Sequence, residues 1–192
     1  MKKIFVIAIA SLIALSANAQ SGRTVIGHVN FNELVMLMPE MDEARATLHA
    51  AQQEAEETYA SMVEEYQTKI TQYQQKSSSW TAAIKEAKEK EIMDMQNRIQ
   101  DFQQSLTQEL QQQQSQLMAP INEKATKVVK EIAKVKGIEV LFDDSQAIYF
   151  DYSRVIDITE EARNALNIKP GRTMESLQAE LAAAAQAQQA KK

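Results

Sequence analysis

The chain of 192 residues contains no cysteine, only three prolines and only four glycines. The absence of cysteine excludes disulfides, thiolate metal sites and cysteine nucleophiles. None of the prolines or glycines lies between Met41 and Ala119. Because these are the residues that most strongly interrupt helices, the sequence allows long unbroken helices across that range.

Long apolar runs are also missing, apart from one near the N-terminus. This run, Ile4 to Leu15, follows Met1-Lys2-Lys3 and precedes the small residues Ala17-Asn18-Ala19. That order is typical of a secretory signal peptide, so we expect residues 1–19 to be cleaved off after Ala19. The alternative is an uncleaved anchor, although the run is short for a membrane span.

Basic residues are in deficit. The expected mature chain, residues 20–192, holds 19 Lys and Arg against 26 Asp and Glu, a net charge of −7. This balance argues against a nucleic-acid-binding protein, which would show a basic surface. The charge is uneven, since residues 41–65 have a net charge of −6 and residues 66–93 a net charge of +2.

Residues that carry catalysis are scarce. The two histidines are His28 and His49, and the sequence has no G-x-S-x-G motif, phosphate-binding loop or metal-spaced histidine pair. The acidic pair Asp143-Asp144 is better interpreted as a turn than as an acid–base pair. We therefore expect no enzyme, no cofactor and no metal site.

The apolar residues between positions 41 and 117 form a pattern that is symmetric about the Ser78–Ser79 bond. Partners such as Leu48 with Leu110, or Tyr66 with Ile92, have position numbers that add to 157 or 158. A helix that folds back at this bond would bring each pair face to face. We therefore predict an antiparallel helical hairpin over residues 41–119, called the arm below, with its tip near residues 77–80.

The spacing also predicts the shape of the arm. From Ala51 to Tyr73 the apolar positions repeat every 11 residues, which favours a straight or slightly right-handed helix pair. Each half would project roughly 55 Å. Ser78 or Ser79 is expected to cap the returning helix. The alternative, which helix propensity does not exclude, is one unbroken helix from Pro39 to Lys136.

The segments on either side of the arm, residues 20–40 and 120–168, predict a small β-rich body. Strands are expected at residues 24–30, 138–142, 147–150 and 155–158, with a turn at 143–146. Three or four short strands cannot cover their own edges, so we expect the sheet to mediate oligomerisation. The predicted fold class is therefore α+β, with the arm inserted between the first and second strands.

Local signals define the remaining elements. Asn30 and Glu33 have the spacing of a capping box that opens a short helix. Pro120 is expected to kink the chain at the root of the arm. Thr159 is expected to cap a short helix. Residues 169–192 form a low-complexity tail that is either a helix or a disordered extension.

Seven arm residues are candidate contact sites. Three tyrosines fall at seven-residue spacing and are interpreted mainly as packing between the two helices, with contact to a partner as the alternative. A tryptophan lies at the tip, where it either makes contacts or folds back onto Tyr73 or Ile84. Three lysines near the tip either form an ordinary solvated face or contact an anionic membrane surface. The candidates are Tyr59, Tyr66, Tyr73, Trp80, Lys76, Lys85 and Lys88.

The body segments carry a family likeness. It rests on residues 25–33, on residues 128–138 leading into 140–143, and on 148–150 and 157–159. With the signal peptide and the inserted arm, residues 20–168 resemble the Skp/OmpH family of periplasmic chaperones. The resemblance implies a homotrimer with a shared β-barrel body, and three arms that enclose a cavity for unfolded outer-membrane proteins.

The function that follows is that of an ATP-independent periplasmic holdase. The competing hypothesis is a structural periplasmic coiled-coil spacer or adaptor. The chain differs from the best-known members in being acidic, and in its alanine-rich tail.

Overall fold

The computed structural model describes residues 24–149 and 151–189, so the expected signal peptide at 1–19 lies outside the described residues. The described protein is mostly helical and contains one small sheet, which confirms the predicted α+β class. The elements are β1 (Ile26–Val29), α2 (Phe31–Leu37), α3 (Pro39–Lys76), the 3₁₀ turn η1 (Ser77–Ser79), α4 (Ala82–Val135), β2 (Val140–Asp143), the 3₁₀ turn η2 (Asp144–Gln146), β3 (Ile156–Asp157), α5 (Thr159–Ala165) and α6 (Met174–Gln189).

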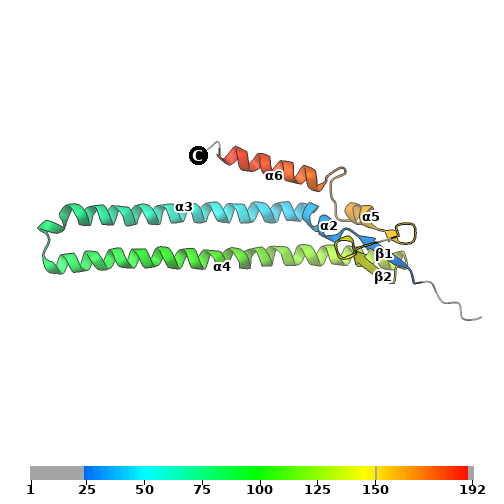
Figure 1. The fold of residues 1–192 in the computed structure, drawn as a ribbon, viewed down its shortest axis with the longest axis horizontal. Coiled ribbons are helices and arrows are strands. Elements are labelled where there is room, and N and C mark those ends of the chain that lie inside the picture. The colour runs from blue at the N-terminus through cyan, green and yellow to red at the C-terminus, as the bar shows by residue number, and fades with distance from the viewer. Residues whose placement is uncertain (1–23, 150, 190–192) are drawn as a thin grey trace, which may run out of the picture.

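Two long helices, α3 and α4, lie side by side, and the chain reverses between them at residues 77–81 (Figure 1). The alternative of one unbroken helix is therefore wrong. Capping by Ser78 or Ser79 is also wrong, because these residues belong to η1. Thr81 is the N-cap of α4, and its hydroxyl oxygen accepts a hydrogen bond from the Ile84 N–H at 3.4 Å.

The helix α4 continues through Pro120 and is 54 residues long (Figure 1). The prediction that Pro120 re-aims the chain at the arm's root is therefore wrong. Proline removes the N–H that would bond the carbonyl four residues earlier, that of Gln116. Both residues are exposed, so water can satisfy this carbonyl and the helix tolerates the proline.

The sheet has the strand order β2-β1-β3, and both outer strands run parallel to β1. Ile26 aligns with Val140 in the first pair and Gly27 with Ile156 in the second. Parallel neighbours need long crossovers. The helices α2, α3 and α4 form the crossover from β1 to β2.

The predicted return strand at residues 147–150 is wrong for residues 147–149, which form no strand; Phe150 lies outside the described residues. A strand that returned directly from β2 would run antiparallel along the outer edge of β2. The chain instead crosses to the far edge of β1 and pairs there as β3. The choice of edge is a long-range one that local strand propensity does not determine.

The core lies where α2 meets α4, α5 and the first turns of α3. Its largest fully buried side chains are Leu34, Leu37, Met38, Ile158 and Leu166. The predicted capping of α2 is confirmed: the Asn30 side-chain oxygen accepts from the Glu33 N–H at 3.2 Å. This cap orients α2 as it leaves β1, which places its apolar face on the core.

Thr159 is not the cap of α5 as predicted, but its first residue. Its N–H donates to the Asp157 carboxylate at 2.8 Å, and its hydroxyl oxygen accepts from the Asn30 N–H at 3.2 Å. Thr159 therefore ties the start of α5 to the end of β1.

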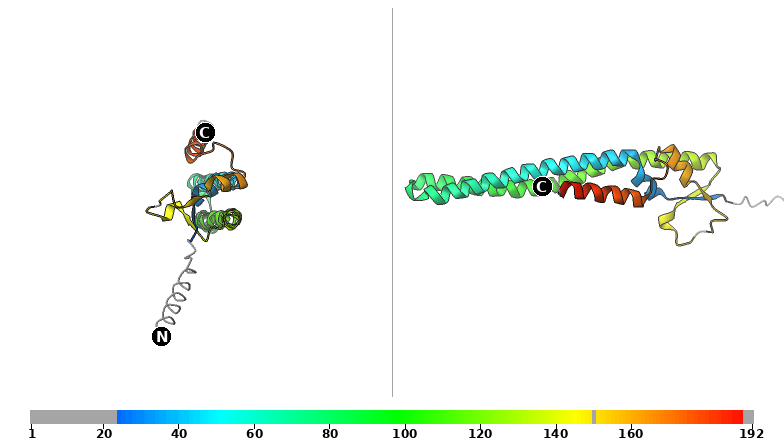
Figure 2. Two further views of the ribbon diagram at one scale, coloured as in Figure 1. Left: turned by 90° about the vertical axis from the view of Figure 1, so that its right-hand side faces the viewer. Right: turned by 90° about the horizontal axis from the view of Figure 1, so that it is seen from above.

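The C-terminal tail forms α6, which turns back and runs alongside the arm (Figures 1 and 2). Leu177 is buried in the core, and Met174 packs against it. Of the two alternatives for the tail, the structure therefore shows the helix, and it shows one end of that helix anchored at the arm's root.

Candidate functional site

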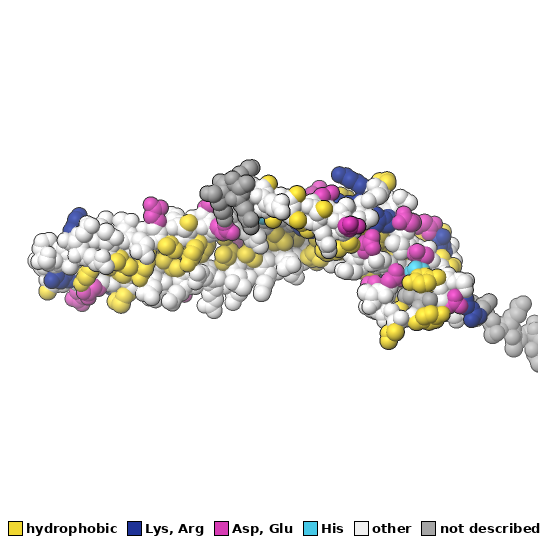
Figure 3. Space-filling view, turned by 45° about the horizontal axis from the view of Figure 1, so that its top comes forward, with side chains coloured by type: hydrophobic (Ala, Val, Ile, Leu, Met, Phe, Trp, Pro, Cys, Tyr) yellow, Lys and Arg dark blue, Asp and Glu magenta, His cyan; other side chains and the backbone are white. Residues whose placement is uncertain are grey.

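The mirrored apolar positions form the least exposed strip of the arm. Met41 and Ala44 at its root are buried, as is Met95 further out. Near the tip Ile84 is 44% exposed. The packing between the two helices is therefore uneven along the arm, and Figure 3 shows a band of apolar side chains along one face of it.

An open apolar groove of about 300 Å³ lies on this strip, and we call it the arm groove. In the mirrored pattern Ala55 faces Phe102 and Ala51 faces Leu106. Of the two alanines, Ala55 lines the groove, and its small side chain leaves room beside Phe102 and Leu106. Its lining is mainly apolar, with amides and one carboxylate: Gln52, Ala55, Glu56, Tyr59, Phe102, Gln103, Leu106 and Leu110.

The three candidate tyrosines are all half-buried on the strip. Tyr59 lines the arm groove. Tyr73 donates a hydrogen bond to the Glu89 carboxylate on α4, and this bond raises the pKa of Tyr73. Tyr59 is thus the candidate tyrosine that the structure places in an open apolar site.

At the tip, Trp80 is half-buried and packs edge-on against Tyr73, with ring centroids 5.8 Å apart at 68°. Lys88 lies 2.8 Å from Glu91, and this bond lowers the pKa of Glu91. Lys76 is exposed and Lys85 is half-buried. The structure therefore brings Trp80 and Tyr73 together, and it engages one of the three tip lysines in an ion pair.

Exposed apolar side chains also occur on the body, on the edge strand β2 and in the loop that follows it, and we call them the body patch. Ile148, Tyr149 and Tyr152 are 105%, 81% and 70% exposed. Val140 and Phe142 on β2 are also exposed. An edge strand beside exposed apolar side chains is typical of a surface that pairs with another chain.

His28 contacts two residues of the loop that carries this patch, Asp144 and Tyr152. Its Nδ1 lies 2.7 Å from the Asp144 carboxylate, and its ring packs edge-on against Tyr152 at 5.3 Å. His28 itself is buried on the central strand. Sequence reasoning missed the body patch because it assigned Ile148 and Tyr149 to a paired strand. The signal that could have indicated the patch is the presence of the apolar residues Ile148 and Tyr149 directly after the predicted turn at residues 143–146.

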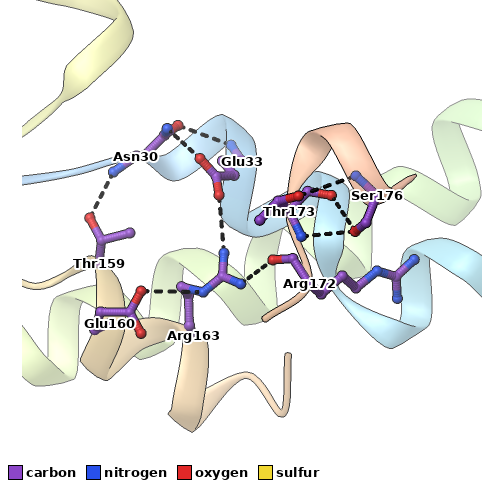
Figure 4. Close-up of polar contacts among 8 residues, drawn as sticks. All are labelled: Asn30, Glu33, Thr159, Glu160, Arg163, Arg172, Thr173 and Ser176. Atoms are coloured by element: carbon purple, nitrogen blue, oxygen red, sulfur yellow. Dashed lines mark hydrogen bonds and ion pairs between the residues drawn. The ribbon is translucent and has the colours of Figure 1, made fainter. Parts of the chain in front are cut away.

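Two arginines join the C-terminal segment to the root of the arm. Arg163 is buried and donates to Glu33 at 3.0 Å and to the carbonyl of Arg172, and it lies 3.5 Å from Glu160 (Figure 4). Arg172 in turn donates to Asp42 in the first turn of α3 at 2.7 Å. These bonds hold the pKa of Asp42 below its ordinary value.

Two other kinds of site, a metal site and a membrane span, do not occur in the part of the chain that the structure describes. Within residues 24–149 and 151–189, no group of histidine and acidic side chains gathers closely enough to hold a metal ion. In the same ranges, none of the helices has the length and apolar character that crossing a membrane requires. Other hollows lie on the body end of α4 and beside β1. The arm groove and the body patch differ from them in carrying aromatic side chains.

The sequence model of a family described as "Outer membrane protein (OmpH-like)" matches residues 25–166. The match runs from the strand that opens the sheet to Leu166, which caps the end of α5. It covers the arm groove, the tip and the body patch, whereas α6 lies beyond it. No curated protein matches the sequence.

Proposed function

The chain belongs to the OmpH-like family, and on this premise we propose that it is an ATP-independent holdase, which binds unfolded outer-membrane proteins and prevents their aggregation. Membership of the family indicates a periplasmic chaperone for outer-membrane proteins. The holdase mechanism and the surfaces assigned to it below are our proposal. The unfolded proteins that it binds are called clients.

The observation that carries the proposal is the arm groove. Strands of outer-membrane barrels alternate apolar and polar side chains, so an unfolded client presents isolated apolar groups along an extended chain. An open apolar groove with an amide rim can accept such groups without selecting one sequence. Burying one large apolar side chain contributes about 1.5–3 kcal/mol, so each contact is weak. A client would be held by many such contacts and released without ATP.

The arm, residues 41–119, is assigned the client contacts. Tyr59 would act in the arm groove, and Tyr66 and Tyr73 would extend the same strip. At the tip, Trp80 would add an aromatic contact, and the lysines would bind an anionic membrane surface weakly. The net charge of +2 over residues 66–93 supports this last assignment.

The body, residues 20–40 and 120–168, is assigned to assembly of a homotrimer. These 70 residues bury little core on their own. The exposed edge of β2 and the body patch supply apolar surface that a second copy could cover. Three bodies joined in this way would leave the arms to enclose a common cavity.

The test is the aggregation of an unfolded outer-membrane β-barrel protein diluted from urea, followed by light scattering. The chain should suppress the scattering equally with ATP, without ATP and in the presence of a chelator. A clear requirement for ATP would contradict the proposal. Unchanged scattering in every condition would favour the alternative of a structural spacer.

A further inference from the structure

The helix α6 is held firmly at its beginning. Leu177 is only 2% exposed in the core, and Arg172 binds Asp42 just before the helix starts. Thr173 and Ser176 cap the first turn reciprocally, each hydroxyl oxygen accepting the other residue's N–H at 3.1 and 3.0 Å (Figure 4). By contrast, the side chains of residues 178–187 are all exposed.

One face of α6 continues from the buried end into the exposed end. Met174, Leu177, Leu181 and Ala184 recur at the three- and four-residue steps that place side chains on one side of a helix. Leu177 lies inside the core, whereas Leu181 is 47% exposed. We call these four residues the α6 stripe. Its first half is covered by the core, and its second half continues the same face without such cover.

The exposed half of α6 reaches the level of the arm groove. On α3, Gln52 and Tyr59 lie 10 and 17 residues beyond Asp42, or roughly 15 to 26 Å along the helix. The lining residue Leu110 pairs with Leu48 in the mirrored pattern, six residues or roughly 9 Å beyond Asp42. On α6, Leu181 and Ala185 lie roughly 10 and 16 Å beyond Met174, so they reach the levels of Leu110 and Gln52. Figures 1 and 2 show α6 directed along the arm toward the tip, and Figure 3 shows the apolar band on the face beside it.

We propose that α6 is a tethered strap, whose apolar stripe closes onto the arm groove through Leu181 and competes there with an apolar segment of a client. The occupant of the groove is the chain's own helix, for two reasons. The buried Leu177 fixes the direction in which the α6 stripe faces, and the length of α6 matches the distance from Asp42 to the arm groove. Tethering makes closure an intramolecular step, so a small apolar contact is enough to populate it. A client that binds the groove would displace the strap.

Closure is tested without any client, by disulfide trapping. The native chain has no cysteine, so any disulfide that forms within one chain must join the two introduced cysteines. Gln52→Cys with Ala185→Cys joins the groove to the stripe face of α6. Gln52→Cys with Ala183→Cys is the matched control, because Ala183 lies on the opposite face. The stripe pair should oxidise several-fold faster, and adding Leu181→Gln should remove the difference. Equal rates for the two pairs would overturn closure.

Competition is tested with the unfolded β-barrel protein as probe, and this part alone rests on the proposed function. Leu181→Gln should bind the client several-fold more tightly than the parent. Ala179→Gln introduces the same residue on the other face of α6 and should bind as the parent does. Parental affinity in Leu181→Gln would overturn the competition. If the parent bound no client at all, the proposed function would fail, while the disulfide rates would still decide closure.

Discussion

The Arg172 guanidinium lies against the Asp42 carboxylate, with Nη2 2.7 Å from Oδ1, although the two residues are 130 positions apart in the sequence. Asp42 belongs to the first turn of α3, and Arg172 lies just before α6. The Arg172 side chain is only 9% exposed. The root of the arm and the C-terminal segment are therefore joined as one unit, with consequences for both stability and function.

The first prediction concerns acid. The hydrogen bond from Arg172 lowers the pKa of Asp42 from its ordinary value of 3.8. A carboxyl group whose folded pKa is depressed stabilises the fold above its unfolded pKa, and this contribution is lost as the pH falls through the folded pKa. At neutral pH, Asp42→Asn should lower the free energy of unfolding by about 1 kcal/mol, since Asp42 is partly exposed and water screens the pair.

The measurement is urea unfolding over a series of pH values. The difference between parent and Asp42→Asn should shrink as the pH falls below about 4. Asp101→Asn, on an exposed position of α4, is the control, and its free energy of unfolding should equal that of the parent at every pH. A difference that stays constant down to the lowest pH would show that the charge of Asp42 is not what stabilises the root.

The second prediction concerns the anchor of α6. Leu177→Ala should lower the free energy of unfolding by about 2–5 kcal/mol, because Leu177 is buried in the core and its truncation leaves a cavity. Leu181→Ala should cost less than about 1 kcal/mol, because Leu181 is 47% exposed. Urea unfolding of the two variants gives the comparison. Similar small losses for both would mean that α6 is not anchored.

The third prediction concerns the register of α3 against α4. Cysteines at Leu48 and Leu110 should form a disulfide within one chain, as should cysteines at Tyr66 and Ile92, because the mirrored pattern places each pair across the strip. Cysteines at Leu48 and Ile92 are the mismatched control. Non-reducing electrophoresis separates links within a chain from links between chains. Links between chains only would contradict the predicted pairing.

The fourth prediction concerns the tip. Replacing Lys76, Lys85 and Lys88 by Glu should abolish weak binding to anionic vesicles, because each lysine near such a surface contributes about 1 kcal/mol. The parent's binding should also fade at high salt. The control makes the same charge change at exposed lysines on the body end of α4: Lys127, Lys130 and Lys134. If the two triple variants sedimented equally with vesicles, the tip lysines would have no special role in membrane binding and would form an ordinary solvated face.

Local patterns in the sequence predicted local structure well. The Asn30–Glu33 spacing predicted the cap of α2, because the bond from the Glu33 N–H to the Asn30 side chain spans only four residues. The reciprocal bond of a capping box is replaced by one from the Asn30 N–H to Thr159, which lies far away in the sequence. The apolar strip predicted which arm side chains are least exposed. Even so, the pattern treated Ala55 as an ordinary packing position, and did not indicate that a groove opens beside this small side chain.

The predictions that were wrong or left open concern features that depend on contacts with the rest of the fold. Residues 147–149 have strand propensity, but the chain leaves the outer edge of β2 open and pairs on the far edge of β1 as β3. Pro120 does not re-aim α4, since its position on an exposed face lets water replace the lost hydrogen bond. The Ala- and Gln-rich tail was compatible with helix or disorder. Its placement depends on Leu177 and Arg172 meeting residues far away in the sequence.

The central claim is that the arm binds the client and that the contacts between copies of the protein are made by the body. It is tested most directly by deleting residues 48–110, which leaves the core residues Met41 and Ala44 and the Asp42–Arg172 pair in place, joining the ends with a short linker, and measuring native mass and suppression of aggregation together. We predict that the truncated chain keeps the trimeric mass of the full-length protein, and no longer prevents an unfolded outer-membrane protein from aggregating. A truncated chain that suppresses aggregation as well as the full-length protein, or that runs as a folded monomer, would contradict the account.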